Sequence, residues 1–158
     1  MNSLFSPLKI GQYTLKNRMV MAPLTRGRAG VDGIPTNIMA KYYGQRASSG
    51  LVIAEATAIT PNGRGWLNSP GLYNQAQVDG WKQVTQRVHQ NGGKIFAQIW
   101  HTGRVSHSIY HNGQVPMSAS DVPMSASDVP ISGHVPLTDN LEYETPRAME
   151  PKEIQTLI

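Results

Sequence analysis

Three short apolar runs, separated by segments with helical spacing, constrain the fold of this chain most strongly. The runs begin near residues 18, 51 and 94, and each is long enough for one strand buried on both faces of a sheet. In the segments between them, apolar side chains recur at three- and four-residue intervals, which is the period of an α-helix. Strands that alternate with helices predict a parallel sheet with right-handed crossovers.

The two helices and an N-terminal hairpin have recognisable boundaries in the sequence. Pro35 suits the first position of the first helix, and Gly50 suits its C-terminal cap. Asn74 is a typical N-cap residue for the second helix, which we expect to run to about Gln90. Ahead of the first strand, residues 8–15 alternate between apolar and polar around a Gly-Gln pair, which predicts a β-hairpin.

The order of strands and helices fits both an open doubly wound sheet and a (β/α)8 barrel. No Gly-x-Gly-x-x-Gly follows a predicted strand, which argues against a dinucleotide-binding Rossmann unit. A complete (β/α)8 barrel needs about 250 residues, whereas the chain has 158. We therefore predict an α/β fold that is the N-terminal part of a (β/α)8 TIM barrel, with its β/α units at about residues 18–104.

After the third predicted strand the alternation stops. Residues 105–146 are predicted to form an extended loop that is rich in Pro, Ser and Gly, and residues 147–158 to begin the next helix. Inside the loop, residues 116–122 are repeated as 123–129. Because each copy contains Pro, a continuous helix is excluded, and we interpret the repeat either as a local duplication or as an error in the sequence. Residues 1–158 are thus predicted to be one partial barrel domain.

Composition excludes several classes of function. Lys and Arg number 14 and Asp and Glu number 10, and the basic residues form no run of the kind that a nucleic-acid-binding protein shows. The chain contains no Cys, which excludes disulfides, zinc-thiolate sites and thiol catalysis. The apolar runs are far shorter than the ~20 residues of a membrane-spanning helix, and no signal peptide is evident. We expect a cytoplasmic location and no membrane partner.

The predicted strands end in residues with related chemistry. Thr25 follows the first strand, Ala56 lies at the end of the second, and Gln98 and Trp100 lie at the end of the third. In a parallel barrel these ends meet at the mouth where ligands bind. A hydroxyl, a carboxamide, backbone amides and an aromatic plane suit a flat heterocycle with mixed donors and acceptors. Taken singly, Thr25 also fits a turn residue, and Gln98 also fits a partner of a neighbouring backbone group.

Four ordered motifs surround these positions. They are residues 17–26 (NRMVMAPLTR), 50–57 (GLVIAEAT), 65–71 (GWLNSPG) and 97–104 (AQIWHTGR). In this order and spacing they resemble the Old Yellow Enzyme family, and in particular its N-ethylmaleimide reductase-like branch. The resemblance implies an FMN-dependent NADH:flavin oxidoreductase of the ene-reductase type, built on a TIM barrel, of which this chain is the N-terminal half.

The same resemblance implies roles for individual residues. Pro23, Leu24 and Thr25 would contact the flavin, with Thr25 near its pyrimidine carbonyl. Ala56 would add a backbone contact, and Gln98 would form hydrogen bonds with the pyrimidine edge.

Two tryptophans are implied in substrate binding. Trp100 would shape the substrate pocket, and Trp66 stands where many relatives carry Tyr, so that a larger ring with an N–H donor replaces a phenol. In the family, the side chains that grip the substrate oxygen and the loops that bind phosphate follow later than Ile158. We therefore expect the catalytic residues beyond Ile158 and only part of the flavin ring site within this chain.

The function implied by the resemblance is hydride transfer from NAD(P)H, through FMN, to an activated alkene such as an α,β-unsaturated carbonyl or nitro compound. We expect the chain alone to be inactive and to require a complementary C-terminal half or self-association, because its last strand would present an unpaired edge. The alternative is a non-catalytic truncated remnant with weak or no flavin binding. An aldolase-type barrel is disfavoured, because no Lys lies at the carboxyl end of a predicted strand.

The remaining candidates receive structural interpretations. His101, His107 and His111 are close in sequence, but their spacing fits no zinc pattern and Cys is absent, so we predict no metal site. We expect His107 and His111 to be solvated in the loop, Glu55 to be paired within the barrel rather than to act as a general base, and Trp81 to lie in the core.

Overall fold

The computed structural model describes residues 3–118, 133–135 and 141–157. Most of the tandem copy, from residue 119 to residue 129, lies outside the described residues. The chain forms two compact units. Unit 1 consists of the residues up to Thr57 together with Asn68–Ile99, and unit 2 consists of Ala58–Leu67 together with the residues from Trp100 onward.

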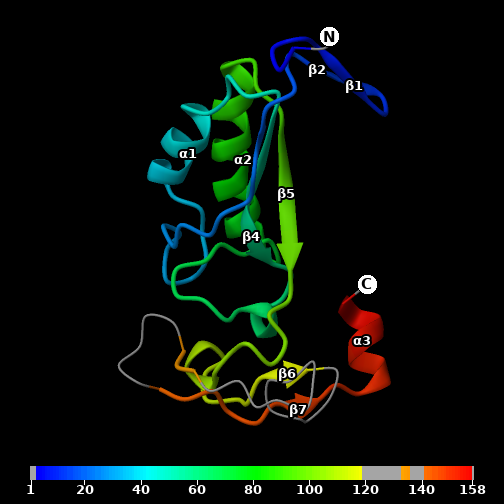
Figure 1. The fold of residues 1–158 in the computed structure, drawn as a ribbon. Coiled ribbons are helices and arrows are strands. Elements are labelled where there is room, and N and C mark those ends of the chain that lie inside the picture. Colours follow the sequence, from blue (N-terminus) through cyan, green and yellow to red (C-terminus); the bar gives the residue numbers. More distant parts are fainter. Residues whose placement is uncertain (1–2, 119–132, 136–140, 158) are drawn as a thin grey trace. The chain divides into compact units, whose positions relative to one another are not determined.

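Unit 1 contains a hairpin followed by a βαβαβ arrangement (Figure 1). Its elements are β1 (Leu8–Ile10), β2 (Tyr13–Leu15), β3 (Val20–Met21), α1 (Asn37–Gly44), β4 (Leu51–Ala58), α2 (Gln75–Gln90) and β5 (Ile95–Trp100). β1 and β2 pair in antiparallel fashion, whereas β3, β4 and β5 form one sheet with β4 in the centre and with β3 parallel to β4. The predicted alternation of strands and helices is therefore confirmed.

The two helices differ in how closely they follow the sequence prediction. Asn74 caps α2 as expected, because its side-chain oxygen accepts a hydrogen bond from the Gln77 amide at 2.9 Å. The predicted bounds of α1 were wrong at both ends, since the helix starts two residues after Pro35 and ends at Gly44. Gly50 is not its cap: a Cβ at this position would collide with the Asn17 carbonyl oxygen, so glycine is required by close packing of the backbone.

The core of unit 1 lies between the two helices and the central strand. Val84 and Val88 of α2 are fully buried, and burial of an aliphatic side chain of this size stabilises a fold by about 1.5–3 kcal/mol. Trp81 is buried with them, as predicted, and its indole N–H donates to the Gly71 carbonyl oxygen at 3.1 Å. The buried members of this cluster are Ala29, Met39, Ala40, Tyr43, Ala47, Val52, Ala54, Trp81, Val84 and Val88.

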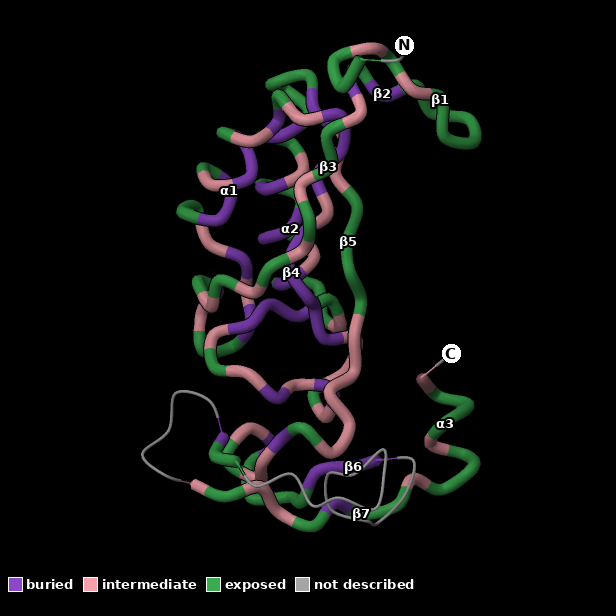
Figure 2. The backbone as a smooth tube through the Cα atoms, in the orientation of Figure 1, coloured by how far each residue is buried: buried purple, intermediate pink, exposed green. Residues whose placement is uncertain are grey.

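The prediction that all three strands are buried holds only for β4. Figure 2 shows β4 buried and β5 exposed along most of its length. Val20 of β3 is 48% exposed, and Phe96 and Ile99 of β5 are 47% and 62% exposed. The physical reason is that α1 and α2 lie on the same side of the sheet (Figure 1), and that the outer edge of β5 pairs with no strand in the described part of the chain.

Unit 2 consists mainly of loops, with a few short strands and helices between them. These are the 3-10 turns η1 (Pro61–Gly63) and η2 (Ser108–Tyr110), the strands β6 (Met117–Ser118) and β7 (Arg147–Ala148), and the helix α3 (Pro151–Leu157). β6 and β7 pair in parallel. The Arg147 guanidinium forms an ion pair with Glu153 at 2.6 Å, which links β7 to the first turn of α3.

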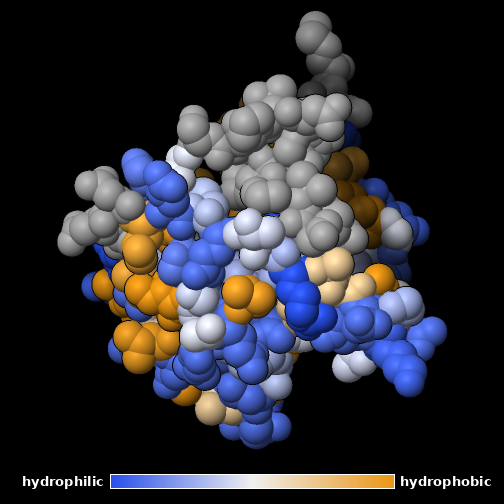
Figure 3. Space-filling model, turned by 90° about the horizontal axis from the view of Figure 1, so that it is seen from below, coloured by the Kyte–Doolittle hydropathy of each residue, from blue (hydrophilic) through white to orange (hydrophobic). Residues whose placement is uncertain are grey.

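The surface carries a mixture of apolar and hydrophilic side chains. In the view of Figure 3, apolar side chains gather mainly at the left of the coloured area, with hydrophilic ones over much of the remainder. Among the residues that the structure describes, no helix is long and apolar enough to cross a membrane.

Candidate functional site

The segment after β3 brings Thr25 near the end of β4, because the amide of the next residue, Arg26, donates to the Glu55 carboxylate at 3.1 Å. Met21 pairs with Val52 in the parallel ladder. The regular ladder stops after Met21, as expected shortly before Pro23, which has no N–H to donate.

The register of β4 and β5 places Gln98 of β5 one residue short of the level of Ala56. The Val52 amide donates to the Lys94 carbonyl oxygen at 2.8 Å, which in a parallel ladder sets Val52 opposite Ile95. Counted from that pair, Ala56 lies opposite Ile99, and Gln98 lies opposite Glu55. Thr25, Ala56 and Gln98 thus lie at or just after the carboxyl ends of three neighbouring strands. This is the edge of a parallel sheet at which ligands bind in α/β proteins.

The polar groups at this edge are open to a ligand. Thr25 is half-buried and Gln98 is exposed, and within the described residues neither side chain forms a hydrogen bond to another protein group. Pro23 is half-buried, and Leu24 is 58% exposed. A free hydroxyl and a free carboxamide beside an apolar segment match the chemistry of a flavin ring, which needs both donors and acceptors along its pyrimidine edge.

A buried carboxylate lies directly behind this edge. Glu55 is fully buried, and its carboxylate accepts hydrogen bonds from the Arg26 amide at 3.1 Å and from the Tyr43 hydroxyl at 3.0 Å. Burial raises the pKa of Glu55, and the donors offset only part of this effect. The prediction that Glu55 is paired within the fold is confirmed, but the sequence did not reveal Tyr43 as its partner.

The two tryptophans predicted for the substrate belong to unit 2. Trp66 and Trp100 are both partly buried. The indole nitrogen of Trp100 is buried and finds no acceptor in the described part of the chain, and the same holds for Nε2 of His101. The other ring nitrogen of His101 accepts a hydrogen bond from the Gly103 amide at 3.0 Å, and burial lowers the pKa of this histidine.

The prediction that His107 and His111 are solvated was wrong. His111 is 6% exposed, and its Nε2 lies 2.7 Å from the hydroxyl oxygen of Ser106, which is fully buried. His107 lies 3.4 Å from Glu144. A polar loop sequence does not reveal these contacts, because they join residues that only the folded loop brings together. Among the described residues, no group of three or more His, Cys, Asp or Glu side chains could hold a metal ion.

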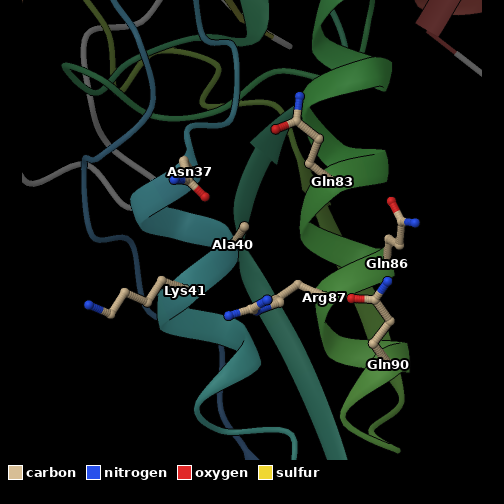
Figure 4. A pocket seen from close by; sticks show the side chains of 7 residues that line it. All are labelled: Asn37, Ala40, Lys41, Gln83, Gln86, Arg87 and Gln90. Atoms are coloured by element: carbon tan, nitrogen blue, oxygen red, sulfur yellow. The ribbon is translucent and has the colours of Figure 1, made fainter.

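Two cavities of unit 1 do not qualify as the flavin site. An open groove of about 570 Å³ between α1 and α2 is walled by Lys41, Arg87 and side-chain amides (Figure 4), and it lacks the apolar and aromatic walls of cofactor pockets. A second cavity beside Glu55 and Tyr42 measures about 130 Å³, well below the ~300 Å³ at which ligand pockets begin. The open strand edge is therefore the candidate site.

Comparison with known proteins identifies the family to which the chain belongs. Residues 3–158 match the NADH:flavin oxidoreductase / NADH oxidase family. The chain belongs to this family. The oxidoreductase 12-oxophytodienoate reductase 7 of Oryza sativa subsp. japonica is 47% identical over 120 residues, which cover 75% of this chain and 30% of the reductase.

Solved structures of the family resemble the chain over nearly its whole length. The Old Yellow Enzyme homologue of Zymomonas mobilis is 48% identical with a TM-score of 0.84, covering 98% of this chain and 42% of that protein. Morphinone reductase in complex with tetrahydroNAD is 43% identical with a TM-score of 0.84, at the same coverage. The chain thus spans less than half the length of these relatives.

The comparisons confirm three predictions made from the sequence. The chain is similar to Old Yellow Enzymes, as the four motifs indicated. The fold class is that of the N-terminal part of a TIM barrel. FMN and a nicotinamide co-substrate are the cofactors of this family of enzymes. The roles of the individual residues at the strand edge remain predictions.

Proposed function

We propose that this chain supplies part of the FMN ring site of an Old Yellow Enzyme-type ene-reductase. The observation that carries the proposal is that Thr25, Ala56 and Gln98 lie at or just after the carboxyl ends of three neighbouring strands, where the Thr25 and Gln98 side chains form no hydrogen bond within the described residues. Three neutral groups at one edge suit a flat, neutral heterocycle better than a charged substrate.

Each residue at the edge has a distinct proposed task. The Thr25 hydroxyl donates to a pyrimidine carbonyl of the ring, and the Gln98 carboxamide both donates and accepts along the same edge. Pro23 and Leu24 pack against the ring, and the backbone at Ala56 adds a polar contact. FMN held by these residues would supply the two-electron chemistry needed for hydride transfer from NAD(P)H to an activated alkene.

The proposed substrates are α,β-unsaturated carbonyl or nitro compounds. Two of the relatives are named as reductases of oxo compounds, 12-oxophytodienoate and morphinone. Trp66 and Trp100 are the proposed substrate contacts in this chain, and the buried indole N–H of Trp100 is a donor without a protein acceptor among the described residues. An apolar ring with one directed N–H suits a flat, unsaturated ketone.

The proposed partner is a complementary C-terminal half, or failing that a second copy of the chain. β5 has an unpaired outer edge within the described residues, and Phe96 and Ile99 on it are largely exposed. An apolar strand with free N–H and C=O groups favours pairing with another strand. We propose that the chain alone does not turn over substrate. The alternative is a non-catalytic remnant. The coverage of 42% of the Zymomonas mobilis relative fits this alternative as well.

A chimera tests the proposal. The chain would be fused to the part of the Zymomonas mobilis homologue that follows the matched region, and FMN content and NADPH consumption with 2-cyclohexenone would be measured. We expect a yellow protein with one FMN per chain and alkene-dependent NADPH oxidation, whereas the chain alone retains little flavin. A folded chimera that neither retains FMN nor oxidises NADPH would favour the remnant.

A further inference from the structure

Two residues of the proposed ring site are direct neighbours of a buried hydrogen-bond network. Arg26, which follows Thr25, donates its amide N–H to one carboxylate oxygen of Glu55 at 3.1 Å. Glu55 precedes Ala56, so the same side chain joins the segments that carry Thr25 and Ala56. This link lies beyond the last ladder pair of β3 and β4, where no regular sheet hydrogen bond holds the two segments together.

Tyr43 of α1 completes the network. Its hydroxyl donates to the other carboxylate oxygen of Glu55 at 3.0 Å, and it accepts a hydrogen bond from the Glu55 amide N–H at 2.8 Å. Tyr43 is fully buried, and its ring packs against Trp81 with 6.3 Å between ring centroids. The helix layer therefore fixes both the backbone and the side chain of Glu55, and through the carboxylate it fixes the backbone at Arg26.

An ionisable group with no exposure is costly to bury, and its burial calls for a specific explanation. If apolar packing were the only requirement at position 55, an apolar residue such as Leu or Met would suffice, as apolar residues do in the rest of the core. A carboxylate with two acceptor oxygens can hold a backbone amide on one side and a phenol on the other. That geometry determines where the backbone after β3 lies relative to the end of β4.

From this geometry we propose that Glu55 is a positioning residue, which, together with Tyr43, holds Thr25 and Ala56 at the spacing that the flavin ring requires. The inference rests on the proposed function, and it adds a residue that does not itself touch the cofactor. Loss of the carboxylate frees the amide of Arg26 and lets the segment with Thr25 move, while Gln98 on β5 is unaffected.

The test compares four variants of the chimera described above. Glu55→Ala removes both acceptors, Tyr43→Phe removes the phenol, and Glu55→Gln keeps one carbonyl oxygen for Arg26. Val88→Ala is the matched control, because it removes fully buried volume from α2 without touching the strand ends. The dissociation constant of FMN, the visible absorption bands of the bound flavin and the midpoint of thermal unfolding would be measured for each.

We expect Glu55→Ala to weaken FMN binding by about tenfold, since a hydrogen bond to a charged group is lost, and to shift the flavin absorption bands. Glu55→Gln should restore much of the affinity, and Val88→Ala should lower the melting midpoint with unchanged flavin bands. If Glu55→Ala does not fold, Tyr43→Phe takes its place, with an expected change in the same direction.

Two results would overturn the inference and remain distinguishable. If Glu55→Ala and Tyr43→Phe affect FMN affinity and spectrum no more than Val88→Ala does, Glu55 is only structural, and the proposed function stands. If the unaltered chimera folds but binds no FMN, the proposed function fails, and the positioning role fails with it.

Discussion

Gln77 on α2 donates a hydrogen bond from its carboxamide nitrogen to the carbonyl oxygen of Asp32, 45 residues earlier in the chain, at 2.9 Å. The carboxamide oxygen accepts a second bond from the Tyr73 amide, also at 2.9 Å. Gln77 is fully buried. One side chain thus joins the loop that follows β3 to the loop that precedes α2.

Replacement of Gln77 by Ala should therefore destabilise unit 1. Two partly buried backbone groups lose their partners, and because water reaches them in part, we expect a total cost of about 1–3 kcal/mol. The free energy of unfolding would be measured by urea denaturation of the chain. Gln86→Ala on the exposed side of the same helix is the control, and an equal, small effect of both substitutions would contradict the role of Gln77.

Substitution of Gly50 by Ala should be more harmful than substitution of Gly92 by Ala. At Gly50 the added Cβ meets the backbone of Asn17, which can yield only if β3 shifts. At Gly92 the Cβ meets nothing, and the cost is the backbone strain of a φ of +71°, about 1 kcal/mol. The denaturation midpoints of the two variants show which substitution costs more stability. A larger loss of stability for Gly92→Ala would show that the contact with Asn17 is not tight.

His111 should titrate below its ordinary pKa of 6.5. Burial lowers the pKa of His111, and the positive charges of Arg64 and His101 act in the same direction. Because the pKa of His111 is lower in the folded chain than in the unfolded chain, the unfolded chain binds a proton at a higher pH. The free energy of unfolding therefore falls as the pH drops below 6.5. NMR titration of the imidazole protons measures the midpoint directly, and a value at or above 6.5 would contradict the buried position.

The pH dependence of stability that Glu55 causes should have the opposite sign to that of His111. Burial raises the pKa of Glu55 above 4.5, despite the donors Arg26 and Tyr43 that face it. Between 4.5 and the raised value the folded chain holds a proton that the unfolded chain has released, so the favourable contribution is complete below 4.5 and is lost as the pH rises through the folded pKa.

The neutral variant Glu55→Gln lacks this pH dependence. Its melting midpoint relative to that of the unaltered chain should therefore increase from pH 4.5 to pH 8. Melting curves of both proteins across this range test the prediction. A difference that stays constant with pH would mean that the carboxylate is not held in a buried environment.

Local signals predicted the elements that depend on neighbouring residues in sequence. The apolar runs located β4 and β5, and Asn74 marked the start of α2, because an N-cap needs only the amides of the next turn. The location of Thr25, Ala56 and Gln98 at the carboxyl ends of neighbouring strands was also accessible, since parallel strands end at the same edge of a sheet.

Features that depend on distant residues were not predicted. Gly50 was assigned to a helix cap, but Asn17 determines its packing. His111 lies in a polar segment, yet Ser106 and the surrounding loop bury it. The link between Tyr43 and Glu55 joins a helix to a strand, and a pattern of polar and apolar residues does not contain that information.

The most direct test of the account is the absorption spectrum of FMN bound to the chimera with Gln98→Ala. We predict shifted flavin bands and weaker retention of FMN, because the carboxamide is the proposed partner of the pyrimidine edge, while Gln86→Ala leaves both unchanged. A folded chimera in which Gln98→Ala and Thr25→Ala leave the spectrum and the affinity of the flavin unaltered would contradict the assignment of the strand edge as the ring site.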